Sequence, residues 1–430
     1  MIQSQKEFYI DPPCNGLSFS VKLYRVKNIT MLKISKRSEN VISSPIRKFL
    51  PMVTTAEKKG IKVFKLNVGD SDIPVPDIFL KTIKKYKDKN VKYAPSSGIP
   101  EHVNSWVKYY SNFNINLKSE NIIPTVGCAE AILFAILAVT DPGDEILIFE
   151  PVYPSYKGLA AICNVSLVPI TLNVKNNFAL PSKSEIAKKI TNKTKAIVVI
   201  NPNNPTGTIL NEKEIKEIIE IAKEYGLFII ADETYREIVF SKKPTSFLQY
   251  PEVKDHVIAL DSVSKKFSCP GARIGALTSF NMEIMKTVLR IAMIRLSAPT
   301  LEQYGMIPLL LDSKKYTKNI IAEYKKRRDI VFSFLEKMPG VTCLEPSGAL
   351  YIIAKLPVSS AEKFVEFLLT EFNYKNETVL VTPIKDFYIT PGMGVDEIRI
   401  AYVINQKDLK KAMALLQKGL QGYLAKNAQQ

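Results

Sequence analysis

The chain of 430 residues is 46% hydrophobic and 23% charged, the balance of a folded globular protein, and its length fits one large domain plus a smaller one. No stretch contains the roughly 18 to 20 consecutive apolar residues that a membrane span needs, and the five cysteines are scattered without CxxC spacing. These features argue against a membrane protein, a disulfide framework and a metal site, and they favour a reducing cytoplasm.

The formal net charge is +17. A basic protein can bind nucleic acid or attract anionic ligands. The lysines are, however, spread along amphipathic stretches such as 81–89 and are not interleaved with aromatic residues. We therefore expect a solvated basic surface and no nucleic-acid or membrane partner, while attraction of dicarboxylate substrates remains open.

Residues 1–33 differ in pattern from the rest of the chain. Their apolar residues show no sustained period, and the run Asp-Pro-Pro-Cys-Asn-Gly at 11–16 is turn-forming. We expect a flexible N-terminal extension. Its basic residues outnumber the acidic ones, so organelle targeting stays open, although the segment is not rich in arginine.

From about residue 60 to 330, short β-branched runs alternate with helical periods. The runs that predict buried strands are 145–149, 196–200, 227–230, 257–260 and 274–277. Between the second and third runs, apolar residues at helical spacing end at Gly226. This alternation predicts an α/β fold whose mostly parallel sheet is covered by helices on both faces.

The pattern changes after about residue 330. The segments that predict further elements are a helix around 330–335, strands at 350–354 and 398–403, and helices near 361–372 and 407–424. They indicate a smaller α/β domain. We expect 34–70 and 330–430 to form this small domain together, and 71–329 to form the large domain.

Unusual polar residues follow three of the predicted strands. Asn204 comes after one strand, Asp232 ends the next, and Lys265 follows a third. Ligands of open parallel sheets gather beyond the carboxyl ends of the strands, so these side chains should meet at one edge. A pocket lysine can form a Schiff base with an aldehyde cofactor. Ser262 three residues before Lys265 and Arg273 eight residues after it give this lysine a distinctive setting.

The segment 261–275, DSVSKKFSCPGARIG, resembles the lysine motif of fold-type-I pyridoxal-phosphate (PLP) enzymes, specifically class I/II aminotransferases of the aspartate aminotransferase type. NPNNPTG at 201–207 and DETYR at 232–236 resemble two further motifs of that family. The similarity runs from about residue 35 to the C-terminus. It implies PLP as cofactor, with Lys265 at the Schiff-base position; the spacing to Ser262 and Arg273 excludes the neighbouring Lys266.

The resemblance also implies how the cofactor ring is held. Asp232 would face the pyridinium nitrogen and keep it protonated, so that the ring can absorb electrons. Tyr235 and Asn204 would hydrogen-bond the ring oxygen. Tyr153 would stack on the ring, whereas Tyr156, two residues later, is expected to belong to the core.

The phosphate-binding positions of the family fall on Ser262, Arg273 and the backbone amides near Cys128 and Ala129, which open an apolar helix over 129–139. Cys128 itself is expected to be small filler. Tyr93 matches a tyrosine that reaches the phosphate of a neighbouring subunit, which implies a homodimer with shared active sites.

The substrate positions of the family fall on Arg399, which would bind the α-carboxylate bidentately together with Asn204, and on Gly69, whose backbone would close over it. Arg295 is the candidate for a distal carboxylate, in a stretch that lines the family's pocket, often from the partner subunit. The stretch 382–394 departs from the family's P-G-x-x-F-G pattern, and Ala129 lacks the charged side chain of some aspartate-specific relatives.

The resulting hypothesis is a PLP-dependent aminotransferase with a ping-pong mechanism. Lys265 would act as general acid/base, with Asp232 and Tyr235 as the other catalytic residues. Arg295 and the positive charge favour aspartate or glutamate as donor. An aromatic- or alanine-type aminotransferase, or a carbon–sulfur lyase on the same fold, are the alternatives, because a fold alone does not fix a reaction.

Overall fold

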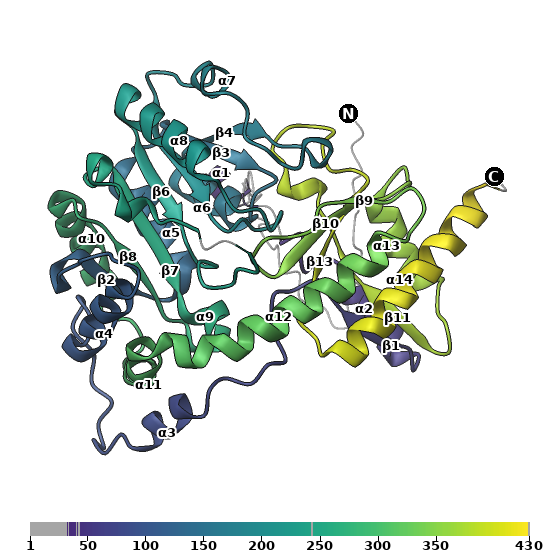
Figure 1. Ribbon diagram of the computed structural model, residues 1–430, viewed down its shortest axis with the longest axis horizontal. Coiled ribbons are helices and arrows are strands. Elements are labelled where there is room, and N and C mark those ends of the chain that lie inside the picture. Colours follow the sequence, from purple (N-terminus) through teal and green to yellow (C-terminus); the bar gives the residue numbers. More distant parts are fainter. Residues whose placement is uncertain (1–31, 33, 40, 42–43, 242–243, 429–430) are drawn as a thin grey trace, which may run out of the picture.

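The computed structural model describes residues 32, 34–39, 41, 44–241 and 244–428 (Figure 1). The prediction of a flexible extension at 1–33 concerns residues that, apart from Leu32, lie outside this range. No helix among the described residues has both the length and the apolar character to cross a membrane.

The largest element is a seven-stranded sheet with the order β2-β8-β7-β6-β5-β3-β4. Its strands are β2 (Ile122–Thr125), β3 (Glu145–Glu150), β4 (Ser166–Thr171), β5 (Thr194–Ile200), β6 (Phe228–Asp232), β7 (Val257–Ser262) and β8 (Gly275–Thr278). β8 runs antiparallel to both of its neighbours, β2 and β7, and all other strand pairs of this sheet are parallel. The predicted mostly parallel sheet is therefore confirmed, and the five expected strands differ from the observed ones by at most a few residues at each end.

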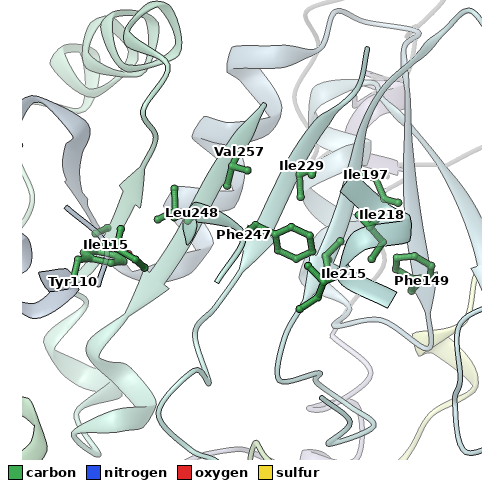
Figure 2. Packing of buried hydrophobic residues seen from close by; sticks show 14 of the residues in the cluster. Tyr110, Ile115, Phe149, Ile197, Ile215, Ile218, Ile229, Phe247, Leu248 and Val257 are labelled. Carbon is green, nitrogen blue, oxygen red and sulfur yellow. The ribbon is translucent and has the colours of Figure 1, made fainter. Parts of the chain in front are cut away.

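Helices cover both faces of this sheet, as Figure 1 shows. They are α4 (Pro100–Ser111), α5 (Gly127–Val139), α6 (Ser155–Cys163), α8 (Glu212–Tyr225), α10 (Met282–Arg295) and α11 (Thr300–Leu311). Alternate residues of β5 supply the two cores: Ile197 and Val199 pack with α8, whereas Ala196 and Val198 pack with α5 and α10. Figure 2 shows the first of these cores, with Ile215 and Ile218 of α8 facing the sheet.

Helix α8 shows how local sequence sets the boundaries. Asn211 and Glu214 form a capping box at its start, and Gly226 ends it in the left-handed conformation, with φ of +64°. The boundary predicted from Gly226 is confirmed. Because α8 returns the chain from the end of β5 to the start of β6, it fixes both strand ends at the same edge of the sheet.

A second core is built mainly from residues 49–66 and from the C-terminal part of the chain, which together also form two small sheets. Strand β1 (Lys62–Lys65) pairs in parallel with β11 (Glu377–Leu380). The second sheet has the order β12-β13-β10-β9, with strands β9 (Thr342–Cys343), β10 (Tyr351–Lys355), β12 (Thr382–Pro383) and β13 (Glu397–Ala401). Helices α2 (Leu50–Lys58), α12 (Ser313–Leu335), α13 (Ala361–Thr370) and α14 (Gln406–Asn427) surround them.

Residues near the two chain ends are therefore neighbours, and α12 extends from the large sheet to this second core (Figure 1). The division into domains at 70/71 and 329/330 stays a prediction. The remaining short helices are α1 (Lys36–Glu39), α3 (Ile78–Lys84), α7 (Lys183–Ala187), α9 (Val263–Lys266) and the 3-10 turns η1 (Ser119–Asn121), η2 (Val174–Asn176), η3 (Phe247–Gln249), η4 (Pro251–Val253), η5 (Pro270–Ala272) and η6 (Lys385–Phe387).

Candidate active site

A cavity of about 370 Å³ lies where the carboxyl ends of β5, β6 and β7 meet the C-terminal part. Eleven of the thirteen predicted site residues line it: Gly69, Cys128, Ala129, Tyr153, Asn204, Asp232, Tyr235, Ser262, Lys265, Arg273 and Arg399. The expected convergence of the three strand ends is observed. Tyr93 and Arg295 do not line the cavity.

Lys265 is placed by the short helix α9, which starts directly after β7. Ser262 caps this helix, since its Oγ accepts from the amide of Ser264 at 3.2 Å. The Nζ of Lys265 donates to the carbonyl of Gly69 at 2.7 Å, so the amine is held on the cavity wall. The backbone at Gly69 approaches Tyr351 so closely that an added Cβ would lie 2.0 Å from the Tyr351 hydroxyl.

Lys266 points away from the cavity. It is buried, and its Nζ contacts both carboxylate oxygens of Asp261, at 2.8 and 2.9 Å. Asp261 also accepts from Arg236 at 2.6 Å. A buried lysine paired in this way is a structural cation. The geometry agrees with choosing Lys265 over Lys266 as the reactive lysine.

Asp232 is a buried carboxylate at the end of β6. Its oxygens accept from the amide of Thr234 at 3.1 Å, the hydroxyl of Tyr156 at 3.1 Å and the thiol of Cys128 at 3.7 Å. Burial raises the pKa of Asp232, and these hydrogen bonds oppose the rise. Among the described residues no lysine or arginine forms an ion pair with Asp232. The carboxylate is therefore available to a cation or N–H donor entering the cavity.

Arg399 is a fully buried cation at the opposite side of the site. Its Nη1 donates to Oδ1 of Asn204 at 3.1 Å and its Nη2 to the carbonyl of Asn67 at 2.7 Å, while Nε has no partner in the described part of the chain. The guanidinium lies 4.2 Å from the ring centroid of Tyr351. Burial lowers the pKa of Arg399. A buried guanidinium without a carboxylate among the described residues is a receptor for an anion.

Two hydroxyl groups and one side-chain amide form a hydrogen-bonded chain that begins at Arg399. The hydroxyls of Tyr235 and Tyr351 lie 3.1 Å apart, and Asn204 Nδ2 donates to the Tyr235 hydroxyl at 3.4 Å. Burial raises the pKa of Tyr351, but the positive charges of Lys265 and Arg399 and the hydrogen bond with Tyr235 outweigh this, so the pKa lies below its usual value. Tyr351 therefore shares the electrostatic environment of the amine.

The remaining end of the cavity is an anion cradle at the start of α5. The first amides of a helix have no intrahelical acceptor and carry positive potential. Arg273, in the left-handed conformation, lies beside them, and its Nη2 donates to the carbonyl of Val126 at 3.3 Å. Gly127 has a φ of +69°, a left-handed conformation that glycine adopts without strain, and its lack of a side chain leaves room for this Nη2, which would lie 2.5 Å from an added Cβ.

These groups fit PLP: a cradle for a phosphate, a buried carboxylate for a ring nitrogen, and an amine for an aldehyde. Comparison with known proteins identifies the family. The family model for "Aminotransferase class I and II" matches residues 61–416. The chain belongs to this family. It is a transaminase, and its fold is that of the fold-type-I enzymes.

An aspartate aminotransferase of Pyrococcus horikoshii is 32% identical to this aminotransferase over 369 residues, which cover 84% of this chain and 91% of the relative. Among solved structures, an alanine aminotransferase from Pyrococcus furiosus is 30% identical with a TM-score of 0.82, covering 91% of this chain and 100% of that one. An aspartate aminotransferase from Thermotoga maritima is 27% identical with a TM-score of 0.83, covering 90% and 100%.

The two predicted residues outside the aminotransferase's cavity have other surroundings. The side chain of Tyr93 is exposed. Arg295 donates to the carbonyl of Pro124 at 3.1 Å, and its Nε lies 3.5 Å from the Glu130 carboxylate. Both predicted roles involve a neighbouring subunit, so they stay predictions.

Several residues of the site were not predicted from the sequence. Tyr156 was expected to belong to the core, and its ring is indeed buried, but its hydroxyl contacts Asp232. Cys128, expected to be filler, also contacts that carboxylate. Tyr351 and Asn67 were not singled out at all. Both lie in segments without a polar motif, and Gly69 was the only residue singled out near Asn67.

Proposed function

We propose that this aminotransferase uses PLP to move an amino group from a dicarboxylic amino acid, aspartate or glutamate, to a 2-oxo acid by a ping-pong mechanism. The observation that carries the proposal is Arg399, a buried guanidinium without an acidic partner in the described structure, in the same cavity as Lys265 and Asp232. Such a group favours a substrate that brings its own carboxylate, as every α-amino acid does. The choice of a dicarboxylic donor is supported separately, by the net charge of +17 and by the relatives described above.

In this proposal the cofactor lies between the anion cradle and Arg399. Arg273, Ser262 and the amides of Cys128 and Ala129 would hold its phosphate, because they line the cavity at the start of α5. Tyr153, which is half-buried in the cavity wall, would stack on the ring.

The ring itself would be held by three polar side chains. Asp232 would accept a hydrogen bond from the ring nitrogen, and Tyr235 and Asn204 would donate to the ring oxygen. When bound, PLP supplies an electron-withdrawing ring that takes up the electron pair left at the substrate's Cα.

The chain's own residues would move the proton and orient the substrate. Arg399 would bind the α-carboxylate with the two-pronged geometry that only a guanidinium offers. Asn204, which accepts from Nη1, would keep that guanidinium in place. Lys265 Nζ would take the proton from Cα and deliver it to the cofactor side as general acid/base, with the Gly69 carbonyl fixing its resting position.

The comparisons support two donors. The Pyrococcus horikoshii relative is named an aspartate aminotransferase, which supports aspartate. The Pyrococcus furiosus structure is titled an alanine aminotransferase, which supports an alanine-type enzyme as second candidate. We further propose a homodimer in which Tyr93 reaches the neighbouring phosphate site, and a cytoplasmic location.

The test follows the visible absorbance of the bound cofactor. L-aspartate, L-alanine and L-tyrosine are added separately to the PLP-loaded enzyme, and matching or non-matching 2-oxo acids are added afterwards. We expect aspartate to bleach the absorbance and 2-oxoglutarate to restore it. Reversal with alanine or tyrosine alone would refute the dicarboxylate part. No reversible change with any pair would contradict transamination and favour a lyase.

A further inference from the structure

The walls of the cavity carry more positive than negative charge. Among the described residues that line it, Asp232 is the one carboxylate, and the cations are Arg47, Lys265, Arg273 and Arg399. The proposed function gives tasks to three of them: Lys265 at the cofactor, Arg273 at its phosphate and Arg399 at the α-carboxylate. Arg47 remains without an anion.

Arg47 precedes helix α2 and is exposed toward the cavity opening. No ion pair or hydrogen bond joins its guanidinium to any described residue. Its neighbour Lys48 differs, since its amine contacts the carboxylates of Glu362 and Asp386. One of two consecutive cations is thus already neutralised, and the other faces the cavity unpaired.

The backbone at Arg47 is tied to the Arg399 end of the site. The Arg47 amide donates to the carbonyl of Ser44 at 3.0 Å. The buried Asn67 donates from Nδ2 to the carbonyl of Ile46 at 2.8 Å, and its own carbonyl accepts from Arg399 Nη2 at 2.7 Å. A single residue therefore links the segment of Arg47 to the guanidinium proposed to bind the α-carboxylate.

We propose that Arg47 is a specificity-determining residue that binds the second carboxylate of a dicarboxylic substrate. This inference rests on the proposed function. A substrate held by Arg399 through one carboxylate could direct the other toward Arg47, where a planar guanidinium can pair with it bidentately. Alanine has no such group and leaves Arg47 in water. Arg295, the candidate from the sequence, does not line the cavity of its own subunit, where it lies beside Glu130; its role toward a neighbouring subunit is a separate prediction.

Arg47 also lies outside the stretch, 61–416, over which the family model matches this chain. The segment that carries it is held by its own turn and by Phe49, which is buried in the second core. Replacing an exposed side chain on this fixed backbone should leave the fold intact.

The experiment is a single-turnover comparison of two donors. Bleaching of the PLP-loaded enzyme is followed with L-aspartate and with L-alanine, without an oxo acid, in wild type, Arg47→Gln and Arg47→Lys. The matched control is Lys58→Gln, which removes one exposed positive charge at the far end of α2. The measured quantity is the ratio of the second-order rate constants for aspartate and alanine.

We expect Arg47→Gln to lower this ratio roughly ten- to a hundredfold, the effect of losing a charge-assisted hydrogen bond, mainly through aspartate. Arg47→Lys should lose less, and Lys58→Gln should not change the ratio. The inference would be overturned if Arg47→Gln left the ratio unchanged, including by an equal loss for both donors, or if wild type preferred alanine. Transamination itself would stand in each case. Absence of bleaching in wild type with either donor would instead overturn the proposed function.

Discussion

Gly69 is a position where a single added methyl group should disturb the site. A Cβ at this residue would lie 2.0 Å from the Tyr351 hydroxyl and 2.9 Å from Cζ of the same ring. Ordinary contact begins at about 3.4 Å, so the ring or the backbone must shift by about 1.4 Å in Gly69→Ala. The Gly69 carbonyl that holds Lys265 would move with the backbone.

Overpacking of this kind costs about 1–3 kcal/mol of folding free energy, and a displacement of about 1 Å near reacting groups costs roughly a hundredfold in rate. We expect kcat/KM of Gly69→Ala to fall about a hundredfold in a steady-state transamination assay. The matched control is Gly158→Ala in helix α6, where no atom lies within 4 Å of the added Cβ. This variant should keep its activity and gain about 0.5–1 kcal/mol of stability.

A second substitution separates the steric cause from any other. Tyr351→Phe removes the hydroxyl that the added Cβ would meet first. In this background Gly69→Ala should cost less than tenfold of the remaining activity, an order-of-magnitude estimate from the relieved overlap. Wild-type kcat/KM in Gly69→Ala, or an equal loss in both backgrounds, would refute the reasoning.

Three further predictions concern charge. Arg399→Lys should lower kcat/KM for aspartate and alanine alike, by roughly ten- to a hundredfold, because a lysine cannot pair bidentately; a loss confined to aspartate would contradict its role. Burial raises the pKa of Asp232, and the hydrogen bond from Tyr156 opposes this rise, so Tyr156→Phe should raise the pKa further. As the pH is lowered, the variant should therefore protonate Asp232 and lose affinity for PLP at a higher pH than wild type. Identical pH profiles of PLP affinity in the two proteins would refute this. Burial lowers the pKa of His102 from 6.5 to about 3. Between these two pH values only the unfolded chain protonates this histidine, so the free energy of unfolding falls as the pH drops. Relative to His102→Gln, denaturant titrations should show wild type losing up to about 1.4 kcal/mol per pH unit; parallel curves would contradict it.

The sequence predicted the parts of the site that lie at strand ends. Asn204, Asp232 and Lys265 could be placed together because parallel strands bring their carboxyl ends to one edge. The antiparallel direction of β8 was not predicted, since a short apolar run looks the same in either orientation.

Contacts between distant segments could not be predicted in the same way. Arg399 and Asn67 are 332 positions apart, and nothing in either local pattern shows that one donates to the other. The contact between Tyr156 and Asp232 was missed for another reason. A tyrosine has an apolar ring and a polar hydroxyl, so a ring that is buried in the core can still donate a hydrogen bond to a carboxylate of the site. Arg47 was not singled out from the sequence, because a single arginine before a helix carries no local signal; only the structure shows that it lines the cavity.

The central claim is that Lys265, and not its neighbour Lys266, carries the cofactor. The most direct test is to reduce the lysine–cofactor linkage of the PLP-loaded enzyme with borohydride, digest the protein and locate the modified lysine by mass spectrometry. The structure, with Lys265 on the cavity wall and Lys266 buried against Asp261, predicts modification at Lys265 alone. Modification at Lys266, or at no lysine of the segment 261–275, would contradict the account.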